Sequence, residues 1–568
     1  MINMILNTLS LINIKEKFFM FVIFVLMIFY SSLEFLSVGI LVPLVSVLFG
    51  DVYSFSLVQN QYLSKFFNYF LSFKIENLLF LVVTFFFFKN ILIFIFITIQ
   101  NFIIFTIRKR IVHNLYQKYL NQDYASLTKL NTSEILRNIS IAQNFSTVLI
   151  SVLNIVLESL VLLSLSIFLI LYNFEIAINI ILIFGSLLII IYYFTKRKIF
   201  KWGQNSQDLD KSIKKNIYEN IANIKEIKLY RRENFFLFLL SQLNYSLAII
   251  DFKIDTFQQI PRFIIEITAV ILLCVIIFIN LNISNNAEII ALLVAYSAVL
   301  FRLMPSTTRV SAALQRLKFY SSQVNILAKE LKLKFVNKPT SIKYNDSFDI
   351  KSLKIININY RYNNASFLIK NLSLSFKKGT INCITGDNGS GKTTLINIIL
   401  GLLKPKNGRL LINNSENLYK YFKYKYNKVG YVSQSTYLLD DSIKNNIIFG
   451  DSNVDMSSLE KAIKASQLSK LISILPNKLE TLVGERGVKL SGGQVQKIAI
   501  ARCLYRNPDF LVLDEFNNNL DMKSELKILN YLKEIKKDKI IIIISHKKEI
   551  YKYCDNVFFL NTKKLVKL

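Results

Sequence analysis

The chain has 568 residues and a formal net charge of +31, and 52% of its residues are hydrophobic, with a mean hydropathy of +0.39. This hydropathy exceeds what a soluble protein needs, and the length allows roughly three or four domains of average size. A strongly basic chain can bind nucleic acid, but the membrane spans described below explain the charge better, so we expect no nucleic-acid partner. The chain has two histidines, and its four cysteines are too widely spaced for a metal or redox motif.

The apolar residues are concentrated in the first part of the chain. A bilayer core of ~30 Å requires about 20 apolar residues in a helix. Six segments meet this requirement, at about 18–48, 77–107, 145–172, 175–199, 252–282 and 286–312. We therefore predict a transmembrane domain over residues 1–330, a linker over 331–349 and a soluble domain over 350–568. The first apolar run is not followed by an A-x-A-like cleavage site, so we expect it to be retained as a helix.

The loops between these segments indicate their orientation. The connections after the second and fourth segments are long and rich in Lys and Arg, whereas the others carry few basic residues. The positive-inside rule places these two basic connections, and with them both termini, in the cytosol. We expect a multi-pass membrane protein.

The first outer loop, at about 51–75, contains a short amphipathic pattern. Its apolar residues recur at helical spacing, at positions Leu63, Phe66, Phe67, Phe70 and Leu71. This spacing fits an interfacial helix lying on the membrane surface. An outer extension of the second span fits the same periodicity equally well.

The predicted spans contain few charges, and a charge in hydrocarbon is costly unless it faces a partner or a cavity. These charges are Glu34, Lys89, Glu158, Arg262, Glu266, Arg302 and Arg309. At 1.5 Å per helical residue, Lys89 and Arg302 lie roughly 20 Å inside the outer surface. Two interpretations remain open. The cations pair with internal glutamates, for example Lys89 with Glu34 or Glu158, or they bind an anionic ligand.

The soluble half begins with a phosphate-binding motif. GDNGSGKTT starts at Gly386, follows the strand-like INCIT and precedes the helix-like LINIILGLL, which is the context that G-x-x-x-x-G-K-[ST] requires. Backbone N–H groups of such a loop form a concavity for an anion. Lys392 places a charge near the β- and γ-phosphates, and Thr393 can hold Mg²⁺. The predicted nucleotide contacts are Gly386, Asn388, Gly389, Ser390, Gly391, Lys392, Thr393 and Thr394.

Three further motifs follow in the soluble half. FLVLDE, at residues 510–515, is a strand that ends in Asp514, a predicted Mg²⁺ ligand, and Glu515, a predicted general base for the attacking water. A second apolar strand, IIIISH, delivers His546 to the γ-phosphate. LSGGQ, at residues 490–494, starts a helix whose N-terminus can bind a second anion, and its predicted contacts are Ser491, Gly492, Gly493 and Gln494.

The order of these motifs resembles the nucleotide-binding domain of ATP-binding-cassette (ABC) transporters over about 350–568. The resemblance implies that ATP and Mg²⁺ are the cofactors, that Tyr362 stacks on adenine, and that Gln434 binds Mg²⁺ and senses the membrane domain. Asp521 is expected in the loop that joins the two ATP sites. The family commonly has S-A-L-D at this loop, whereas this chain has Asn518, Asn519, Leu520 and Asp521.

In this family ATP lies between the phosphate loop of one domain and the LSGGQ motif of another. The resemblance therefore implies a homodimer of half-transporters in which each chain has the type I ABC exporter fold. That fold combines six transmembrane helices with a cytosolic α/β P-loop ATPase domain. Coupling helices are expected in the cytosolic connections around 123–126 and 217–224.

The membrane half is similar to bacterial lipid-linked oligosaccharide flippases of the PglK type in DYASLTKLNTSEIL, NIKEIKL, IPRFIIE and FRLMPS. This resemblance implies ATP-driven flipping of a polyprenyl-pyrophosphate glycan across the bacterial cytoplasmic (inner) membrane, with Arg262 and Arg302 as cavity arginines. Guanidinium groups offer bidentate donors to phosphate, and Lys89 and Arg309 complete the predicted substrate residues. Two alternatives stay open, an exporter of another amphiphile such as a lipid A-like glycolipid, a drug or a peptide, and an ATP-gated channel.

Overall fold

The computed structural model describes residues 2–48, 61–71, 73–280, 286–332, 350–362, 368–414, 416–418, 428–561 and 564–567. The chain divides into two compact units. The first comprises Met1–Gln122 and Leu127–Val336, and the second comprises Asp123–Ser126 and Asn337–Leu568.

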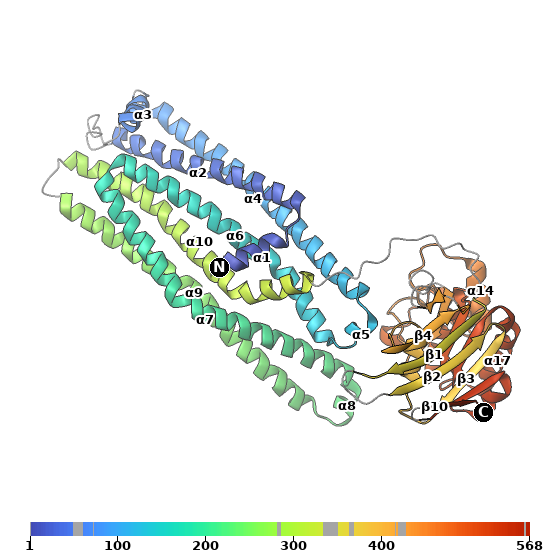
Figure 1. The fold of residues 1–568 in the computed structure, drawn as a ribbon. Helices are drawn as coiled ribbons and strands as arrows, with labels where there is room; N and C mark the ends of the chain where they lie inside the picture. The colour runs from blue at the N-terminus through green and yellow to red at the C-terminus, as the bar shows by residue number, and fades with distance from the viewer. Residues whose placement is uncertain are drawn as a thin grey trace. The chain divides into compact units, whose positions relative to one another are not determined.

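The first unit is built from helices, and the long ones lie side by side (Figure 1). In chain order they are α1 (Ile2–Ser10), α2 (Ile14–Leu48), α3 (Gln61–Leu71), α4 (Ile75–Asn121), α6 (Thr132–Tyr172), α7 (Phe174–Ala222), α8 (Ile224–Leu229), α9 (Glu233–Asn280) and α10 (Asn286–Lys332). The short helix α5 (Tyr124–Leu127) lies at the first expected coupling segment, 123–126. The second expected segment, 217–224, falls mostly on the end of α7, and α8 begins only at its last residue. Their contact with an ATPase domain stays a prediction.

Five helices in the described part of the chain are long and apolar enough to cross a membrane, namely α2, α4, α6, α7 and α9. Helix α10 covers the sixth predicted segment, although the side chains of residues 286–295 lie outside those described. The helices continue well beyond the predicted spans, since α7 ends at Ala222 and not near residue 199. Hydropathy marks only the apolar part of each helix, and α7 continues beyond it as a polar segment.

The amphipathic segment of the outer loop forms a separate helix, α3, and not an outer extension of α4, which starts at Ile75. Phe67 of α3 is fully buried in an apolar cluster with residues of α2, α6, α9 and α10, while Tyr62 and Tyr69 are exposed. Residues 51–60 of the predicted outer-loop segment lie outside the described residues. That α3 lies on the membrane surface stays a prediction.

The second unit is built on two sheets. One is antiparallel, with strand order β2-β1-β4-β5, and the other has the order β10-β9-β3-β8-β7-β6. The strands are β1 (Ser352–Tyr360), β2 (Ile369–Lys377), β3 (Thr380–Gly386), β4 (Asn407–Ile412), β5 (Glu416–Asn417), β6 (Val429–Val432), β7 (Phe510–Asp514), β8 (Ile540–Ile544), β9 (Asn556–Asn561) and β10 (Lys564–Lys567). Each residue of β7 and β8 is buried, as expected for central parallel strands covered on both faces.

The order of the second sheet explains how distant motifs meet. Strands β3, β8 and β7 are parallel neighbours, so their carboxyl ends lie at one edge of the sheet. The phosphate loop follows β3, Glu515 follows β7 and His546 comes just after β8. Ligands of open α/β sheets bind outside the carboxyl ends of the strands.

The α-helices in the described part of this unit are α11 (Lys392–Ile399), α13 (Ile443–Ile448), α14 (Met456–Ala465), α15 (Ser469–Ile474), α16 (Gly492–Tyr505) and α17 (Met522–Ile535).

Candidate functional site

The phosphate loop connects β3 to α11 and depends on glycine at two points. Gly391 is the residue before α11 and has φ +95°, a left-handed conformation that side chains disfavour. A Cβ at Gly386 would lie 2.2 Å from the carbonyl oxygen of Leu560, so only glycine fits beside β9. The loop therefore brings backbone close to the start of a helix, where N–H groups face an anion.

One polar side chain of this loop lacks a protein partner where a ligand would sit. The Ser390 hydroxyl is buried and has no hydrogen-bond partner among the described residues. Lys392 folds back across the loop, and its Nζ donates to the carbonyl oxygens of Gly386 at 2.8 Å and Asp387 at 2.9 Å. Burial lowers the pKa of Lys392, and the nearby Glu515, Asp387 and Asp514 partly offset this. A bound phosphate would supply acceptors for both side chains.

The predicted Mg²⁺ ligands fit a hard cation. Asp514 ends β7 and is 5% exposed, and burial together with the adjacent Glu515 raises its pKa from 3.8 to about 6. Thr393 is exposed at the first turn of α11. Carboxylate and hydroxyl oxygens suit Mg²⁺, which takes few protein ligands and completes its shell with phosphates and water. A buried carboxylate without enough positive charge beside it is the kind of site that a cation stabilises.

Glu515 brings the predicted catalytic residues together. Its backbone is left-handed, with φ 46°, and its N–H donates to the carbonyl oxygen of Ile544 at 3.0 Å. Its Oε2 accepts a hydrogen bond from Gln434 Nε2 at 2.6 Å, and its Oε1 lies 3.5 Å from His546 Nε2. A strained backbone at a charged residue is typical of functional sites. Because its amide nitrogen binds Glu515, the amide oxygen of Gln434 is available for its predicted role as a Mg²⁺ ligand.

One contact at this carboxylate was not predicted. Asn518 Nδ2 donates to the same Oε2 of Glu515 at 2.7 Å. The sequence marked Asn518 as a departure from the family pattern, but assigned no role to it. The signal was the longer amide side chain at a position where the family commonly has serine.

The LSGGQ motif opens α16 as predicted from its sequence. Ser491 caps the helix, with Gln494 N–H donating to its Oγ at 3.4 Å and Ser491 N–H donating to Gln494 Oε1 at 2.9 Å. Ser491 and Gly492 are exposed. A Cβ at Gly493 would lie 2.6 Å from the carbonyl oxygen of Asn519, so glycine lets the 518–519 turn pack closely on this motif.

Tyr362 lies just after β1, with its side chain 49% exposed. Its hydroxyl is 3.1 Å from Thr394 Oγ1, and its ring packs edge-to-face on Tyr360. An aromatic ring is thus held beside α11. Asn388 and Gly389 form the exposed tip of the phosphate loop. Stacking of adenine on Tyr362 stays a prediction.

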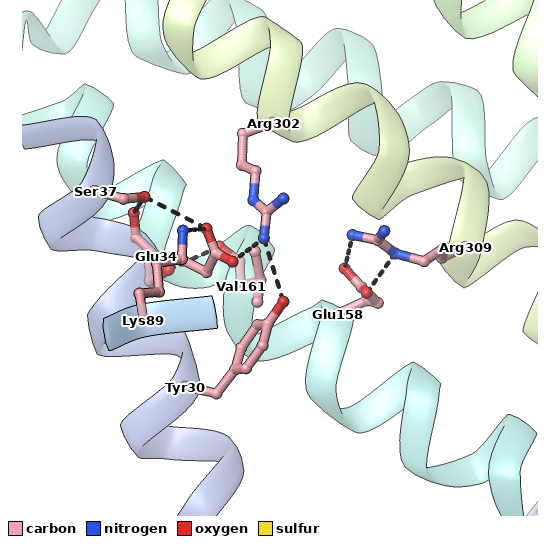
Figure 2. A network of polar contacts seen from close by, with 9 residues as sticks. Tyr30, Glu34, Ser37, Lys89, Glu158, Val161, Arg302 and Arg309 are labelled. Carbon is pink, nitrogen blue, oxygen red and sulfur yellow. Dashed lines mark hydrogen bonds and ion pairs between the residues drawn. The ribbon is translucent and has the colours of Figure 1, made fainter. Parts of the chain in front are cut away.

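Within the first unit, the structure pairs three of the four predicted substrate cations with glutamates (Figure 2). Glu34 of α2 is fully buried and accepts from Lys89 Nζ of α4 at 2.8 Å, and it also forms an ion pair with Arg302 of α10. Arg309 Nε lies 2.5 Å from Glu158 Oε1. Lys89, Arg302 and Arg309 are therefore paired with internal glutamates, which is the first of the two interpretations of the sequence. Arg262 is exposed and makes no hydrogen bond or ion pair with any described residue.

The two ion-pair sites differ in charge. Arg309 and Glu158 neutralise each other, whereas Lys89 and Arg302 carry two positive charges against the single negative charge of Glu34, which leaves +1. Arg302 Nη2 also donates to the Tyr30 hydroxyl at 3.2 Å, a partner that no sequence pattern indicated. We call Glu34, Lys89 and Arg302 the charge triad.

Comparison with known proteins agrees with this architecture. The family model described as ABC transporter matches residues 369–518. A putative export ATP-binding/permease protein of Rickettsia prowazekii is 38% identical over 215 residues, 37% of each chain. A protein of the same description from Rickettsia bellii is 27% identical over 468 residues, 78% of each chain. The alignments with the two Rickettsia relatives of higher identity reach only 37% and 38% of those proteins' length.

Among solved structures, a bacterial Atm1-family ABC exporter with ATP bound superposes with a TM-score of 0.76 at 18% identity. The superposition covers 96% of this chain and 93% of that one, and at this identity it establishes the fold. The C-terminal domain is therefore an ABC-transporter ATPase domain with ATP and Mg²⁺ as its cofactors, and the chain as a whole has the fold of an ABC exporter.

Proposed function

We propose that this protein is an ATP-driven exporter whose substrate is an amphiphile with an anionic head. The observation that carries the proposal is the charge triad, in which two cations share one buried carboxylate between three apolar helices. A surplus positive charge in a low-dielectric interior is costly, and an anionic ligand would neutralise it. A neutral ligand would not.

Arg302 is the member of the triad that a ligand can reach. Its side chain is 29% exposed, compared with 6% for Lys89 and 0% for Glu34. Its Nε is buried without a hydrogen-bond partner in the described structure. A guanidinium group has five donors in a planar fork, so Arg302 keeps donors for phosphate oxygens while it holds Glu34 and Tyr30.

Within this class, a lipid-linked oligosaccharide is the proposed substrate. A polyprenyl pyrophosphate carries its charge on the group that must cross the bilayer, while its tail remains in the lipid. The segments that resemble lipid-linked oligosaccharide flippases and the unpaired, exposed Arg262 support this choice. We further propose that the protein acts in the bacterial cytoplasmic membrane, with both termini in the cytosol.

ATP hydrolysis is the proposed source of energy for transport. Lys392 and the phosphate loop bind the phosphates, Thr393, Asp514 and Gln434 hold Mg²⁺, and His546 contacts the γ-phosphate. Glu515 accepts the proton of the attacking water. Because Ser491 and Gly492 are exposed at the start of α16, a second copy of the chain can complete each site, and we propose a homodimer with two equivalent ATP sites.

The substrate class is tested by comparing which compounds stimulate ATP hydrolysis. The purified protein is reconstituted in lipid nanodiscs, and phosphate release is measured with a polyprenyl-pyrophosphate glycan, a neutral polyprenol, a lipid A-like glycolipid, a hydrophobic drug or a peptide. We expect stimulation by the pyrophosphate lipid, and a smaller response in the Arg302→Ala variant. Arg316→Ala is a matched control, because Arg316 is an exposed arginine of the same helix. Stimulation by the neutral polyprenol alone contradicts the proposal.

A further inference from the structure

The turn that follows β7 is held at several points. Asn518 N–H donates to the carbonyl oxygen of Glu515 at 3.2 Å, which closes the turn directly after the predicted base. Asn517 is fully buried, and its Nδ2 donates to Glu525 Oε1 at 2.9 Å. Asp521 caps α17 by accepting from Ser524 N–H at 2.9 Å. These bonds leave the backbone at residue 518 little freedom to move away from Glu515.

The side chain of Asn518 is directed at the reacting group. Its Nδ2 lies 2.7 Å from Glu515 Oε2, a short distance that is typical of a hydrogen bond to a charged acceptor. Gln434 Nε2 lies 2.6 Å from the same oxygen. With two amide donors on Oε2, Oε1 is the oxygen left to accept a proton from water. The two bonds therefore determine which oxygen of the carboxylate serves as the base.

Serine at position 518 would not make the same contact from this backbone. The serine hydroxyl is attached to Cβ, whereas the asparagine amide nitrogen lies one bond further from the backbone. The asparagine that replaces the family's common serine is therefore the residue type that reaches Oε2 here. The neighbouring Asn519 packs on Gly492 and Gly493 of the LSGGQ motif, so the same turn touches both the base and the motif proposed to face the second copy.

We propose that Asn518 is a positioning residue for ATP hydrolysis, which holds Glu515 Oε2 so that Oε1 faces the attacking water. Gln434 has a second task as a proposed Mg²⁺ ligand, and Asn518 is free of such a task. The inference rests on the proposed hydrolysis at Glu515, and it is independent of what the protein transports.

The experiment measures steady-state ATP hydrolysis by the full-length protein in nanodiscs, with Mg²⁺-ATP titrated. Asn518→Asp keeps the shape but removes the donor and places a carboxylate against Glu515, so kcat should fall well over tenfold. Asn518→Ala removes the donor without adding charge, and its kcat should fall about tenfold, the scale of one lost bond to a charged group. KM for ATP should stay within about twofold in both variants, because Asn518 has no predicted contact with the nucleotide.

The order of the two variants separates positioning from a structural role. If Asn518 only filled space, the isosteric aspartate would be tolerated better than alanine. Thermal unfolding of each variant checks the fold, and Asn530→Asp makes the same change on the exposed face of α17 as a control.

Three results would overturn the inference: Asn518→Asp within twofold of the unaltered protein, Asn518→Asp more active than Asn518→Ala, or a change in KM in place of kcat. If the unaltered protein does not hydrolyse ATP, the proposed function fails together with this inference. Normal hydrolysis by both variants overturns the inference alone.

Discussion

Arg302 of α10 and Glu34 of α2 form an ion pair in the interior of the helical unit, and Lys89 of α4 binds the same carboxylate. The three residues come from distant parts of the sequence, so this triad links three helices. The triad joins these helices, and its unbalanced charge is the basis for the proposed binding of an anionic substrate. The predictions below separate these two roles.

Removing the only anion of the triad should destabilise the protein. Glu34→Gln leaves Lys89 and Arg302 buried or half-buried without a counter-charge, a loss that typically costs about 3–5 kcal/mol. Lys89→Met leaves the neutral Arg302–Glu34 pair and should cost much less. Thermal unfolding in detergent measures both variants, with Glu76→Gln, an exposed glutamate of α4, as the control. Equal unfolding temperatures for Glu34→Gln and Lys89→Met would contradict this account of the triad.

Replacing the predicted general base should stop turnover but not binding. Glu515→Gln keeps the size of the side chain and removes the charge that accepts a proton, so hydrolysis should fall by 10²-fold or more. The variant should retain ATP, measured as nucleotide that stays with the protein through gel filtration. Glu534→Gln, on the exposed face of α17, is the matched control. Rapid hydrolysis by Glu515→Gln would show that another group is the base.

The raised pKa of Asp514 predicts how the stability of the folded protein depends on pH. Its pKa is raised from 3.8 to about 6, so the folded protein binds a proton more tightly than the unfolded chain does. The contribution of this group to stability therefore falls as the pH rises from about 4 to about 6, and the loss persists above pH 6. In the absence of Mg²⁺, Asp514→Asn should stabilise the protein at pH 7 by on the order of 2 kcal/mol.

This gain should disappear below about pH 4, where the carboxyl is protonated in both states. The same variant should lose Mg²⁺-dependent ATP hydrolysis. The measurement is thermal unfolding of both proteins across this pH range with a chelator present. A gain in stability that does not change with pH would indicate that Asp514 is not the titrating group.

Two inactive variants should restore activity when mixed if each ATP site is shared between two chains. Lys392→Ala impairs the phosphate loop, and Ser491→Arg blocks the start of α16. A mixed dimer of these chains has one doubly altered site and one intact site. Random assembly of a two-fold dimer should therefore recover roughly a quarter of the unaltered activity. No recovery after co-expression and co-purification of the two chains would contradict the shared site.

Much of the ATPase site could be predicted from sequence because its motifs lie at the ends of buried strands. FLVLD and IIIII read as continuous apolar runs, and parallel strands bring their carboxyl ends to one edge, so the phosphate loop, Glu515 and His546 were expected together. The Asn518 contact was not predicted, because the sequence shows which residue type stands at position 518 but not where the turn after β7 places its amide.

The membrane half was predictable in its helices but not in their register. Hydropathy located the spans, and the sequence provided Glu34 and Glu158 as possible partners for the buried cations. Which cation meets which glutamate depends on how α2, α4, α6 and α10 are aligned, and this follows from packing of the whole unit. The hydrogen bond from Arg302 to the Tyr30 hydroxyl joins residues 272 positions apart, so no local sequence pattern indicated it.

ATP-dependent movement of a polyprenyl-pyrophosphate glycan in sealed vesicles tests the central claim most directly. The glycan is labelled with a fluorophore, and its exposure to an external quencher is followed after ATP is added to vesicles that contain either the unaltered protein or Arg302→Ala. The account predicts ATP-driven movement by the unaltered protein and its loss in Arg302→Ala, with basal ATP hydrolysis retained. Movement at the same rate in both would contradict it.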